Sequence, residues 1–453
     1  MHKFTSPWLA QLKEERPHFH INENTSCDVA IVGGGIAGMA TAYHLLKNTQ
    51  HSVLLIEAGR IAHGATGRNA GQVVSYFERS FESIVEAFGL EMAATAQNNI
   101  DAAWDILEGI VKKCGLSTPL HMCVGYAGFS KLDQILSHLE ERALKDKAGI
   151  KLKPLLIKAD PVLRQQIPEH LQKYILEVPH SIILKALETE DQTFIALEIS
   201  KKGCMNSALF CEELAAWMTT VYPERFRIAE HLPVEVVQLE KNSATLKTAS
   251  VTITAKKVVL CTNGFEHFTI ENNSGDQIDK GFHIDIQGVV GYMAGYYDEA
   301  GQVPAAVSYY RPKLAKESYH YLTRRPYENS ESSAYSLICI GGPERFLPDR
   351  ATYDPTRPFP ADVDEELDSE LRNSYSDLPP AASRTFLWQG LMCYTPNKLR
   401  RIGYEPKNNV LLYNLGCNGV GILPSLYGGK RIAQLLSGIH LPPCIFDPAN
   451  GHK

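Results

Sequence analysis

The sequence lacks long apolar runs. No stretch reaches the roughly 18 consecutive apolar residues that a transmembrane helix needs, so we expect no integral membrane segment. The N-terminus, MHKFTSPWLAQLKEERP, has no apolar segment of the kind found in secretion signals. Basic residues are not in excess either, since 45 Lys and Arg stand against 51 Asp and Glu with no dense basic run. We therefore expect a cytoplasmic protein that binds no nucleic acid.

Cysteine is scarce and irregularly spaced. Ten cysteines occur among 453 residues, and no two of them form a C-x-x-C pair. The 16 histidines show no metal-ligand spacing, so we expect no metal site. The cysteines are interpreted as reduced, mostly buried thiols of a cytoplasmic protein.

Glycine, by contrast, is concentrated in one informative segment, Asp28–Gly38, with the sequence DVAIVGGGIAG. The apolar residues up to Val32 predict a buried parallel strand. Gly33, Gly35 and Gly38 then occupy the three glycine positions of G-x-G-x-x-G. In this motif the first glycine permits the turn, the second lets the backbone approach a pyrophosphate, and the third lets helix and strand pack closely.

The residues that follow complete a dinucleotide-binding unit. An Ala-rich helix is expected over residues 39–46, and its N-terminus offers free N–H groups to phosphates. A second strand over 52–56 leads to Glu57, 19 residues after Gly38. An acidic residue at this position accepts hydrogen bonds from an adenosine ribose. Strand, turn, helix, strand and acid together predict a bound dinucleotide.

The rest of the chain alternates between strand-rich and α/β segments. Strands are predicted at 122–129, 233–240, 244–246, 251–254, 257–261, 284–297, 319–324, 336–341 and 410–415, and helices within 81–114 and at 131–144, 207–218, 364–374 and 426–437. A proline-rich connector is predicted over 343–360. We expect an α/β protein with a discontinuous Rossmann-like domain over residues 1–75, 190–270 and 385–453. An inserted substrate domain with a mixed or antiparallel sheet is expected over 76–189 and 271–384.

A second glycine-rich loop after Glu57 distinguishes flavin from nicotinamide binding. It has the sequence GATGRNAGQ over Gly64–Gln72, where an NAD enzyme continues from its second strand into a plain helix. This loop resembles that of the D-amino-acid-oxidase-like superfamily of FAD oxidoreductases, and most closely its gamma-glutamylputrescine oxidoreductase branch. Three later segments resemble the same family, namely VVLCTNG ending at Gly264, WQGLMCYTP from Trp388, and Gly416–Gly421.

The resemblance implies an FAD cofactor, which we expect to be bound non-covalently. The residues expected to contact it are Gly33, Gly35, Ile36, Ala37, Gly38, Glu57, Ala58, Arg60, Ala65, Thr66, Gly67, Arg68, Asn69, Ala70, Gln72, Val234, Thr262, Asn263, Gly264, Gly390, Gly419, Val420, Gly421 and Ile422.

The chemistry that the resemblance implies is oxidation of the C–N bond of an amine or amino acid. Flavin carries the hydride transfer, so no side chain is assigned as a catalytic acid, base or nucleophile. The small-molecule substrate is gamma-glutamylputrescine-like, or an N-substituted or free amino acid, and the electron acceptor is oxygen, a quinone or a carrier. Aromatic side chains can surround an amine and an arginine can pair with a carboxylate. The candidates of these two kinds are Tyr309, Tyr310, Arg311, Tyr319, Tyr321, Arg324 and Arg68.

Two departures from the family pattern leave a second function open. Val420 replaces a histidine of the usual S-G-H-G loop, and Asn397 replaces the acid of T-P-D-x-x-P. A flavin-bound protein with lost catalysis, acting as a binding or assembly factor, is therefore the alternative. An NAD-linked dehydrogenase is disfavoured by the Gly64–Gln72 loop. An FAD hydroxylase is disfavoured because no Gly-Asp precedes a C-terminal helix.

Overall fold

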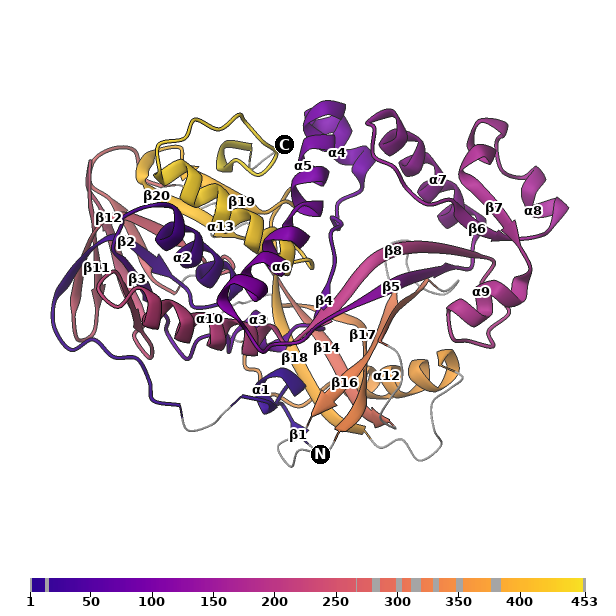
Figure 1. Ribbon diagram of the computed structural model, residues 1–453, viewed down its shortest axis with the longest axis horizontal. Helices are drawn as coiled ribbons and strands as arrows, with labels where there is room; N and C mark the ends of the chain where they lie inside the picture. The colour runs from indigo at the N-terminus through magenta and orange to yellow at the C-terminus, as the bar shows by residue number, and fades with distance from the viewer. Residues whose placement is uncertain are drawn as a thin grey trace.

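Two β-sheets organise the chain, as the computed structural model shows (Figure 1). The structure describes residues 2–12, 16–265, 267–278, 286–298, 304–310, 319–328, 334–347, 353–375 and 384–450. Within these residues one sheet has nine strands and the other has eleven. The nine-stranded sheet lies at the left of Figure 1, and the eleven-stranded sheet extends from the centre to the right.

The nine-stranded sheet is built around parallel strands. Its members, from one edge to the other, are β13 (Thr269–Asn272), β10 (Val234–Leu239), β11 (Ala244–Thr248), β12 (Thr252–Leu260), β2 (Thr25–Val32), β3 (Val53–Ile56) and β9 (Phe226–Ala229), with β20 (Asn408–Leu415) beside β12 and β19 (Arg401–Glu405) beside β20. β2 is parallel to both β3 and β12, and β12 is parallel to β20. Because β2 and β3 are buried on both faces, their sequences are almost continuously apolar.

Three helices cover one face of this sheet (Figure 1). They are α2 (Ile36–Asn48), α10 (Ser207–Val221) and α13 (Ile422–Leu436). Val29 and Ile31 of β2 pack into the core with these helices, whereas Ala30 and Val32 pack into the core on the opposite face. Alternate residues of a strand point to opposite faces, so one apolar run supplies both cores.

The eleven-stranded sheet is mostly antiparallel. Its order is β1 (His2–Lys3), β18 (Arg384–Tyr394), β14 (Gln287–Asp298), β17 (Ala334–Leu347), β16 (His320–Glu328), β15 (Ala305–Tyr310), β5 (Leu120–Phe129), β8 (Ala196–Met205), β6 (Leu155–Lys158) and β7 (Ile175–Val178), with β4 (Gln72–Val73) beside β8. The parallel pairs are β1 with β18, β15 with β5, and β6 with β7.

Shorter elements surround the two sheets. They are α1 (Pro7–Ala10), α3 (Ala65–Arg68), α4 (Phe81–Phe88), α5 (Leu90–Asp101), α6 (Ala103–Cys114), α7 (Leu132–Lys147), α8 (Pro161–Gln165), α9 (His180–Ala186), α12 (Ala361–Ser374) and the 3-10 turns η1 (Glu169–Tyr174) and η3 (Pro448–Asn450). None of the helices in the described ranges is long and apolar enough to span a bilayer. The ten cysteines are free thiols, and eight of them are buried.

Helix α12 covers one face of the eleven-stranded sheet, which leaves the other face for the site. Val363, Leu367 and Leu371 of α12 pack in one core with Tyr292 and Tyr296 of β14. The alternate residues of β14, Val289, Gly291 and Met293, line a cavity on the other face. The alternation of the strand therefore separates core residues from cavity residues.

The predicted fold class is confirmed, including the strand, glycine turn, helix and strand at the start of the chain. Two boundaries differ from those expected. β8 and β18 lie within ranges assigned to the cofactor domain, but they pair with β5 and β14 in the eleven-stranded sheet. The predicted connector over 343–360 is also partly strand, because β17 continues through Leu347 while paired with β14.

Candidate active site and cofactor cleft

A cavity of about 1020 Å³ lies between the two sheets. On one side it is bounded by the turns that follow β2, β3, β12 and β20, which all end at the same edge because they are parallel. On the other side it is bounded by the uncovered face of β14, β16, β17 and β18. A ligand held in the turns would therefore face the uncovered side of the sheet.

The first turn shows why its glycines are needed. Gly33 has φ +108°, and a Cβ atom there would lie 2.6 Å from the carbonyl oxygen of Cys261. A Cβ atom on Gly38 would lie 2.0 Å from the carbonyl oxygen of Gly33. Helix α2 begins at Ile36, whose N–H donates to Thr66 Oγ1 at 3.0 Å, with no side-chain cap from Gly35. The turn thus brings backbone and a helix N-terminus to the cavity wall.

Glu57 closes the same turn from the second strand. Its carboxylate accepts hydrogen bonds from the N–H groups of Gly34 at 2.7 Å and Gly59 at 2.9 Å. Burial raises its pKa, and the two N–H donors partly offset that effect. Each carboxylate oxygen retains acceptor capacity toward the cavity, as the expected contact to ribose hydroxyls requires.

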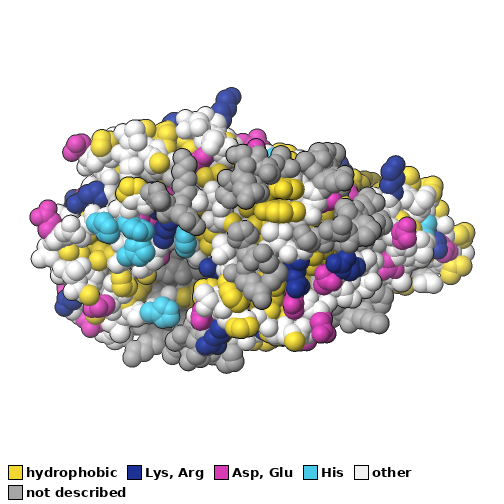
Figure 2. Space-filling model, turned by 90° about the horizontal axis from the view of Figure 1, so that it is seen from below, with side chains coloured by type: hydrophobic (Ala, Val, Ile, Leu, Met, Phe, Trp, Pro, Cys, Tyr) yellow, Lys and Arg dark blue, Asp and Glu magenta, His cyan; other side chains and the backbone are white. Residues whose placement is uncertain are grey.

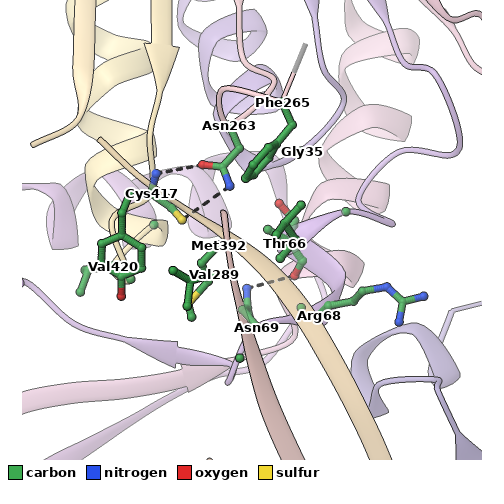
Figure 3. Close-up of a pocket in the computed structure, with 18 of the residues that line it drawn as sticks. Gly35, Thr66, Arg68, Asn69, Asn263, Phe265, Val289, Met392, Cys417 and Val420 are labelled. Atoms are coloured by element: carbon green, nitrogen blue, oxygen red, sulfur yellow. Dashed lines mark hydrogen bonds between the residues drawn. The ribbon is translucent and has the colours of Figure 1, made fainter. Parts of the chain in front are cut away.

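The second glycine-rich loop is held in place by its own side chains. Asn69 Nδ2 donates to the carbonyl oxygen of Thr66 at 3.0 Å and to Ser207 Oγ at 2.9 Å, while Asn69 Oδ1 accepts from the Gly71 N–H at 2.7 Å. Figure 3 shows Asn69 and Thr66 on the wall opposite Cys417 and Val420. This loop therefore forms the second wall of the cleft.

The turns after β12 and β20 are joined across the cleft. The N–H of Cys417 donates to Asn263 Oδ1 at 2.9 Å, and Asn263 Nδ2 donates to Cys417 Sγ at 3.5 Å (Figure 3). Asn263 has φ +59° and is followed by Gly264 at φ +89°. The two loops thus act as one unit, although 154 residues separate them in sequence.

The residues present fit a flavin dinucleotide. A glycine turn that a Cβ atom would block, an uncapped helix N-terminus and a carboxylate follow one another along the cavity wall. These groups suit a pyrophosphate and a ribose, and the further loops extend the same cleft to a chamber over the sheet.

Most of the predicted cofactor residues line this cavity. Those that do are Gly33, Gly35, Ile36, Ala37, Glu57, Ala58, Ala65, Thr66, Arg68, Asn69, Ala70, Gln72, Val234, Thr262, Asn263, Gly390, Gly419, Val420, Gly421 and Ile422. Gly38, Arg60, Gly67 and Gly264 are not among the lining residues. Gly38 packs against Gly33, Gly67 packs against Ala62 and Leu9, and Arg60 forms an ion pair with Glu212.

The sheet side of the cavity is rich in tyrosine and carboxylate. Tyr319 Oη donates to Glu78 Oε1 at 3.4 Å and shares a hydrogen bond of 2.9 Å with Tyr76 Oη. A Cβ atom on Gly419 would lie 2.9 Å from Tyr394 Oη and 3.4 Å from Glu78 Cδ, so both side chains reach the last cofactor loop. This chamber is continuous with the cofactor cleft.

The predicted substrate residues are not all brought together. Tyr319 and Tyr321 line the cavity, and Tyr310 stacks behind Tyr319 with ring centroids 4.7 Å apart. Tyr309 lies on the opposite face, where its hydroxyl donates to the carbonyl oxygen of Leu187. Arg311 lies outside the described residues.

Arg324 also faces away from the cavity. Its guanidinium donates to both carboxylate oxygens of Glu188, at 2.7 and 2.9 Å, and to the hydroxyl of Tyr375. Arg324 stands three positions after Tyr321, an odd number, so the two side chains point to opposite faces of β16.

Sequence reasoning missed several lining residues, among them Tyr76, Glu78, Met293, Glu344 and Tyr394. Tyr394 could have been found, because it alternates with Gly390 and Met392 along a strand of the recognised segment. Glu78 follows β4 in an irregular segment and carries no local signal. Glu344 stands where a connector was expected.

The two departures from the family pattern have different surroundings. Val420 lines the cavity. Asn397 instead holds its own turn, because its Oδ1 accepts from the Leu399 N–H at 3.1 Å and its Nδ2 donates to the carbonyl oxygen of Asn450 at 3.1 Å. The loss of the acid at Asn397 therefore concerns loop structure rather than a group lining the cleft.

Comparison with known proteins identifies the family. The DAO family, described as FAD dependent oxidoreductase, matches residues 28–435. Gamma-glutamylputrescine oxidoreductase of Escherichia coli is 32% identical over 109 residues, which cover 24% of this chain and 25% of that protein. A probable oxidoreductase of Haemophilus influenzae, OrdL, is 23% identical over 52% of this chain and 49% of its own length. These alignments span half or less of each curated relative.

Solved structures of similar fold cover nearly the whole chain. Glycine oxidase from Geobacillus kaustophilus superposes with a TM-score of 0.66 at 18% identity, covering 93% of this chain and 98% of that one. L-Proline dehydrogenase from P. horikoshii superposes with a TM-score of 0.67 at 16% identity, covering 94% and 98%. At these identities the similarity establishes the fold.

Proposed function

The chain belongs to the DAO family of FAD-dependent oxidoreductases, and from this premise we propose that it oxidises a carbon–nitrogen bond of a small amine or amino acid. One observation carries the proposal, namely that the cofactor cleft continues into a chamber lined by tyrosines and carboxylates. When bound, FAD supplies an acceptor for two electrons and a proton.

In the proposed reaction the substrate loses two hydrogens across its C–N bond, and water then hydrolyses the imine to a carbonyl compound and an amine. The oxidised substrate must be a neutral amine, so the ammonium form has to lose a proton first. Glu78 is placed to receive that proton, because it reaches Gly419 of the cofactor loop and accepts a hydrogen bond from Tyr319. Tyr319 in turn is hydrogen-bonded to Tyr76.

The tyrosines contribute shape and hydrogen bonds rather than negative charge. Burial, with the charges of Glu344 and Glu78, raises the pKa of Tyr394 far above its usual value. Burial likewise raises the pKa of Tyr319, with Glu78 adding to the effect. Both phenols therefore stay neutral: Tyr319 donates its hydroxyl hydrogen to Glu78, and Tyr394 holds its O–H beside the Gly419 loop.

The proposal is tested by anaerobic mixing of the purified yellow protein with a panel of amines and amino acids. Bleaching of the visible flavin absorbance by one of them supports C–N oxidation, and admission of air then separates oxygen from a quinone or carrier as acceptor. Flavin that no compound bleaches favours the alternative of a flavin-bound protein without catalysis. Release of the flavin by acid precipitation tests the expected non-covalent binding.

A further inference from the structure

We propose that the substrate carries two cationic nitrogens joined by a carbon chain, as a diamine does, and that Glu344 binds the nitrogen that is not oxidised. The inference rests on the proposed function, because it names the substrate class of the same cavity. Its ground is the arrangement of charge in the chamber, where carboxylates face the cavity and the arginines are held by other groups.

Glu344 lies beside two glycines on the cavity side of the sheet. In the strand register Glu344 of β17 is opposite Gly291 of β14, and Gly291 is opposite Gly390 of β18. All three residues line the cavity. Neither glycine carries a side chain, and their places are taken by Met392, whose Cε would lie 3.0 Å from a Cβ atom on Gly291, and by the Arg68 backbone, whose carbonyl oxygen would lie 2.8 Å from one on Gly390.

The carboxylate of Glu344 is available to a ligand. No other side chain in the described ranges makes a hydrogen bond or ion pair with it, and Glu344 is an exposed residue that lines the cavity. A carboxylate without a counterion attracts a cation. A substrate ammonium would supply that cation, which favours binding of a doubly charged amine over a singly charged one.

The surroundings of Glu344 suit an ammonium group. Glu344, Glu78, Tyr321 and Tyr394 all line the same cavity. Burial, with the charges of the two glutamates, raises the pKa of both tyrosines, so their rings stay neutral. Tyr321 Oη donates to Met293 Sδ at 3.3 Å, so Met293 lies beside its ring. Aromatic faces attract ammonium groups, and a carboxylate supplies the charge.

Among the described residues, the arginines that line the cavity already have other partners and are not offered to a substrate carboxylate. Three arginines line the cavity, and the structure shows each guanidinium engaged. Arg68 donates to the carbonyl oxygen of Phe4 at 2.9 Å and points away from Val289 and Met392 in Figure 3. Arg345 pairs with Asp362, and Arg400 donates to Asn414 at 2.8 and 3.0 Å. Glu78 and Glu344 would in addition repel a substrate carboxylate.

The test compares three compounds with the same four-carbon chain, namely 1,4-diaminobutane, 1-aminobutane and 4-aminobutanoate. Anaerobic flavin reduction is expected at least tenfold faster at low concentration with the diamine than with either of the others. Glu344→Gln is expected to raise the KM for the diamine at least tenfold more than the KM for 1-aminobutane, whereas Glu344→Asp retains part of the preference. Glu365→Gln, an exposed change of the same kind on α12, serves as the control.

A second readout does not depend on turnover. The bis(trimethylammonium) derivative of butane has no N–H and cannot form an imine, so its binding is measured by calorimetry on the FAD-loaded protein. If this binding weakens at least tenfold in Glu344→Gln, the result supports the inference about Glu344. If in addition no amine reduces the flavin, only the proposed oxidation is overturned. Reduction by 4-aminobutanoate or an α-amino acid in preference to the diamine overturns the inference alone. An unchanged diamine preference in Glu344→Gln also overturns it.

Discussion

At the scale of single residues, Gly38 is the glycine of the cofactor turn that leaves the least room for an added side chain. A Cβ atom there would lie 2.0 Å from the carbonyl oxygen of Gly33, so Gly38→Ala must push the helix away from the strand. We expect the variant to bind FAD at least tenfold more weakly, measured as flavin content and as the Kd for reconstitution.

The matched control is Gly109→Ala in α6, where a new Cβ atom would meet no other atom within 4 Å. This variant should retain full flavin and gain roughly 0.5–1 kcal/mol of stability, since alanine favours the helix. Equal flavin content in the two variants would contradict the role given to Gly38.

Arg324 is predicted to stabilise the fold rather than to bind substrate. The residue is 6% exposed, and its guanidinium is hydrogen-bonded to Glu188 and Tyr375. Arg324→Met leaves the Glu188 carboxylate without this partner and should lower the free energy of unfolding by roughly 3 kcal/mol. Denaturant unfolding measures this change, and the KM for the amine should change less than twofold.

Arg372→Met is the comparison for this experiment. Its ion pair with Asp368 lies on the exposed surface of α12, and its loss should cost less than about 0.5 kcal/mol. A large rise in KM in Arg324→Met at unchanged stability would restore Arg324 as a substrate residue.

At the scale of elements, an N-terminal arm is fastened beside the cofactor cleft. Arg16 donates to both oxygens of Glu230, at 2.7 and 2.9 Å, and the N–H groups of Phe19 and Ile61 donate to the same carboxylate. Glu230 follows β9, and Ile61 follows the turn that begins at Glu57. One buried carboxylate thus joins three separate segments.

This junction gives the protein a defined acid sensitivity. Burial alone would raise the pKa of Glu230, but the hydrogen bonds from Arg16, Ile61 and Phe19 lower it from 4.5 to about 2. An acid whose pKa is lowered by folding stabilises the protein fully above its unfolded pKa and less as pH falls. Glu230→Gln should therefore cost roughly 2–3 kcal/mol at pH 7, with a smaller difference from wild type as pH falls from 4.5 toward 2.

Urea unfolding of wild type and Glu230→Gln across this pH range measures the effect. Glu224→Gln, an exposed glutamate near the same strand, should show no such pH-dependent difference. A stability difference that stays constant from neutral to acid pH would remove Glu230 as its source.

At the scale of the whole molecule, the cavity is assembled from segments spread along the chain. Its walls include the turns near Gly33 and Thr66, the start of β10 at Val234, the loop at Asn263 and the loop at Gly419. Figure 2 shows that positive and negative side chains are interspersed on one face of the molecule, while histidines gather at the end that holds the nine-stranded sheet. The cavity between the two sheets therefore depends on the fold of the whole chain.

Removal of FAD should consequently destabilise the whole chain. Free FAD at 100 times its Kd should raise the free energy of unfolding by about 2.7 kcal/mol, and the Tm should rise with FAD concentration. ADP would fill only the nucleotide part of the cleft, so it should raise the free energy of unfolding and the Tm less than FAD does. Differential scanning calorimetry of the flavin-free protein with added FAD or ADP measures these two Tm shifts. A Tm that does not change with FAD would contradict binding of the cofactor in the cleft.

The local sequence determined the cofactor half of the site. The glycine motif predicts a strand, a turn, a helix and a final acid from the spacing of Gly33, Gly35, Gly38 and Glu57. Each of these features depends on residues close to it in the sequence, about two helical turns or one strand away. The Gly64–Gln72 loop and the later family segments identified the flavin in the same way. These features are confirmed because backbone geometry encodes them locally.

The tertiary structure alone decided the substrate half. Glu78 and Glu344 line one cavity, whose sheet wall forms because β14 pairs with β17 on one side and with β18 on the other, and no local pattern specifies which strands become neighbours. The same long-range pairing moved β8 and β18 into the eleven-stranded sheet and gave Arg324 its partner Glu188, 136 residues away. Strand pairing depends on the fit of distant surfaces, so the charge facing the substrate emerges only when the chain is folded.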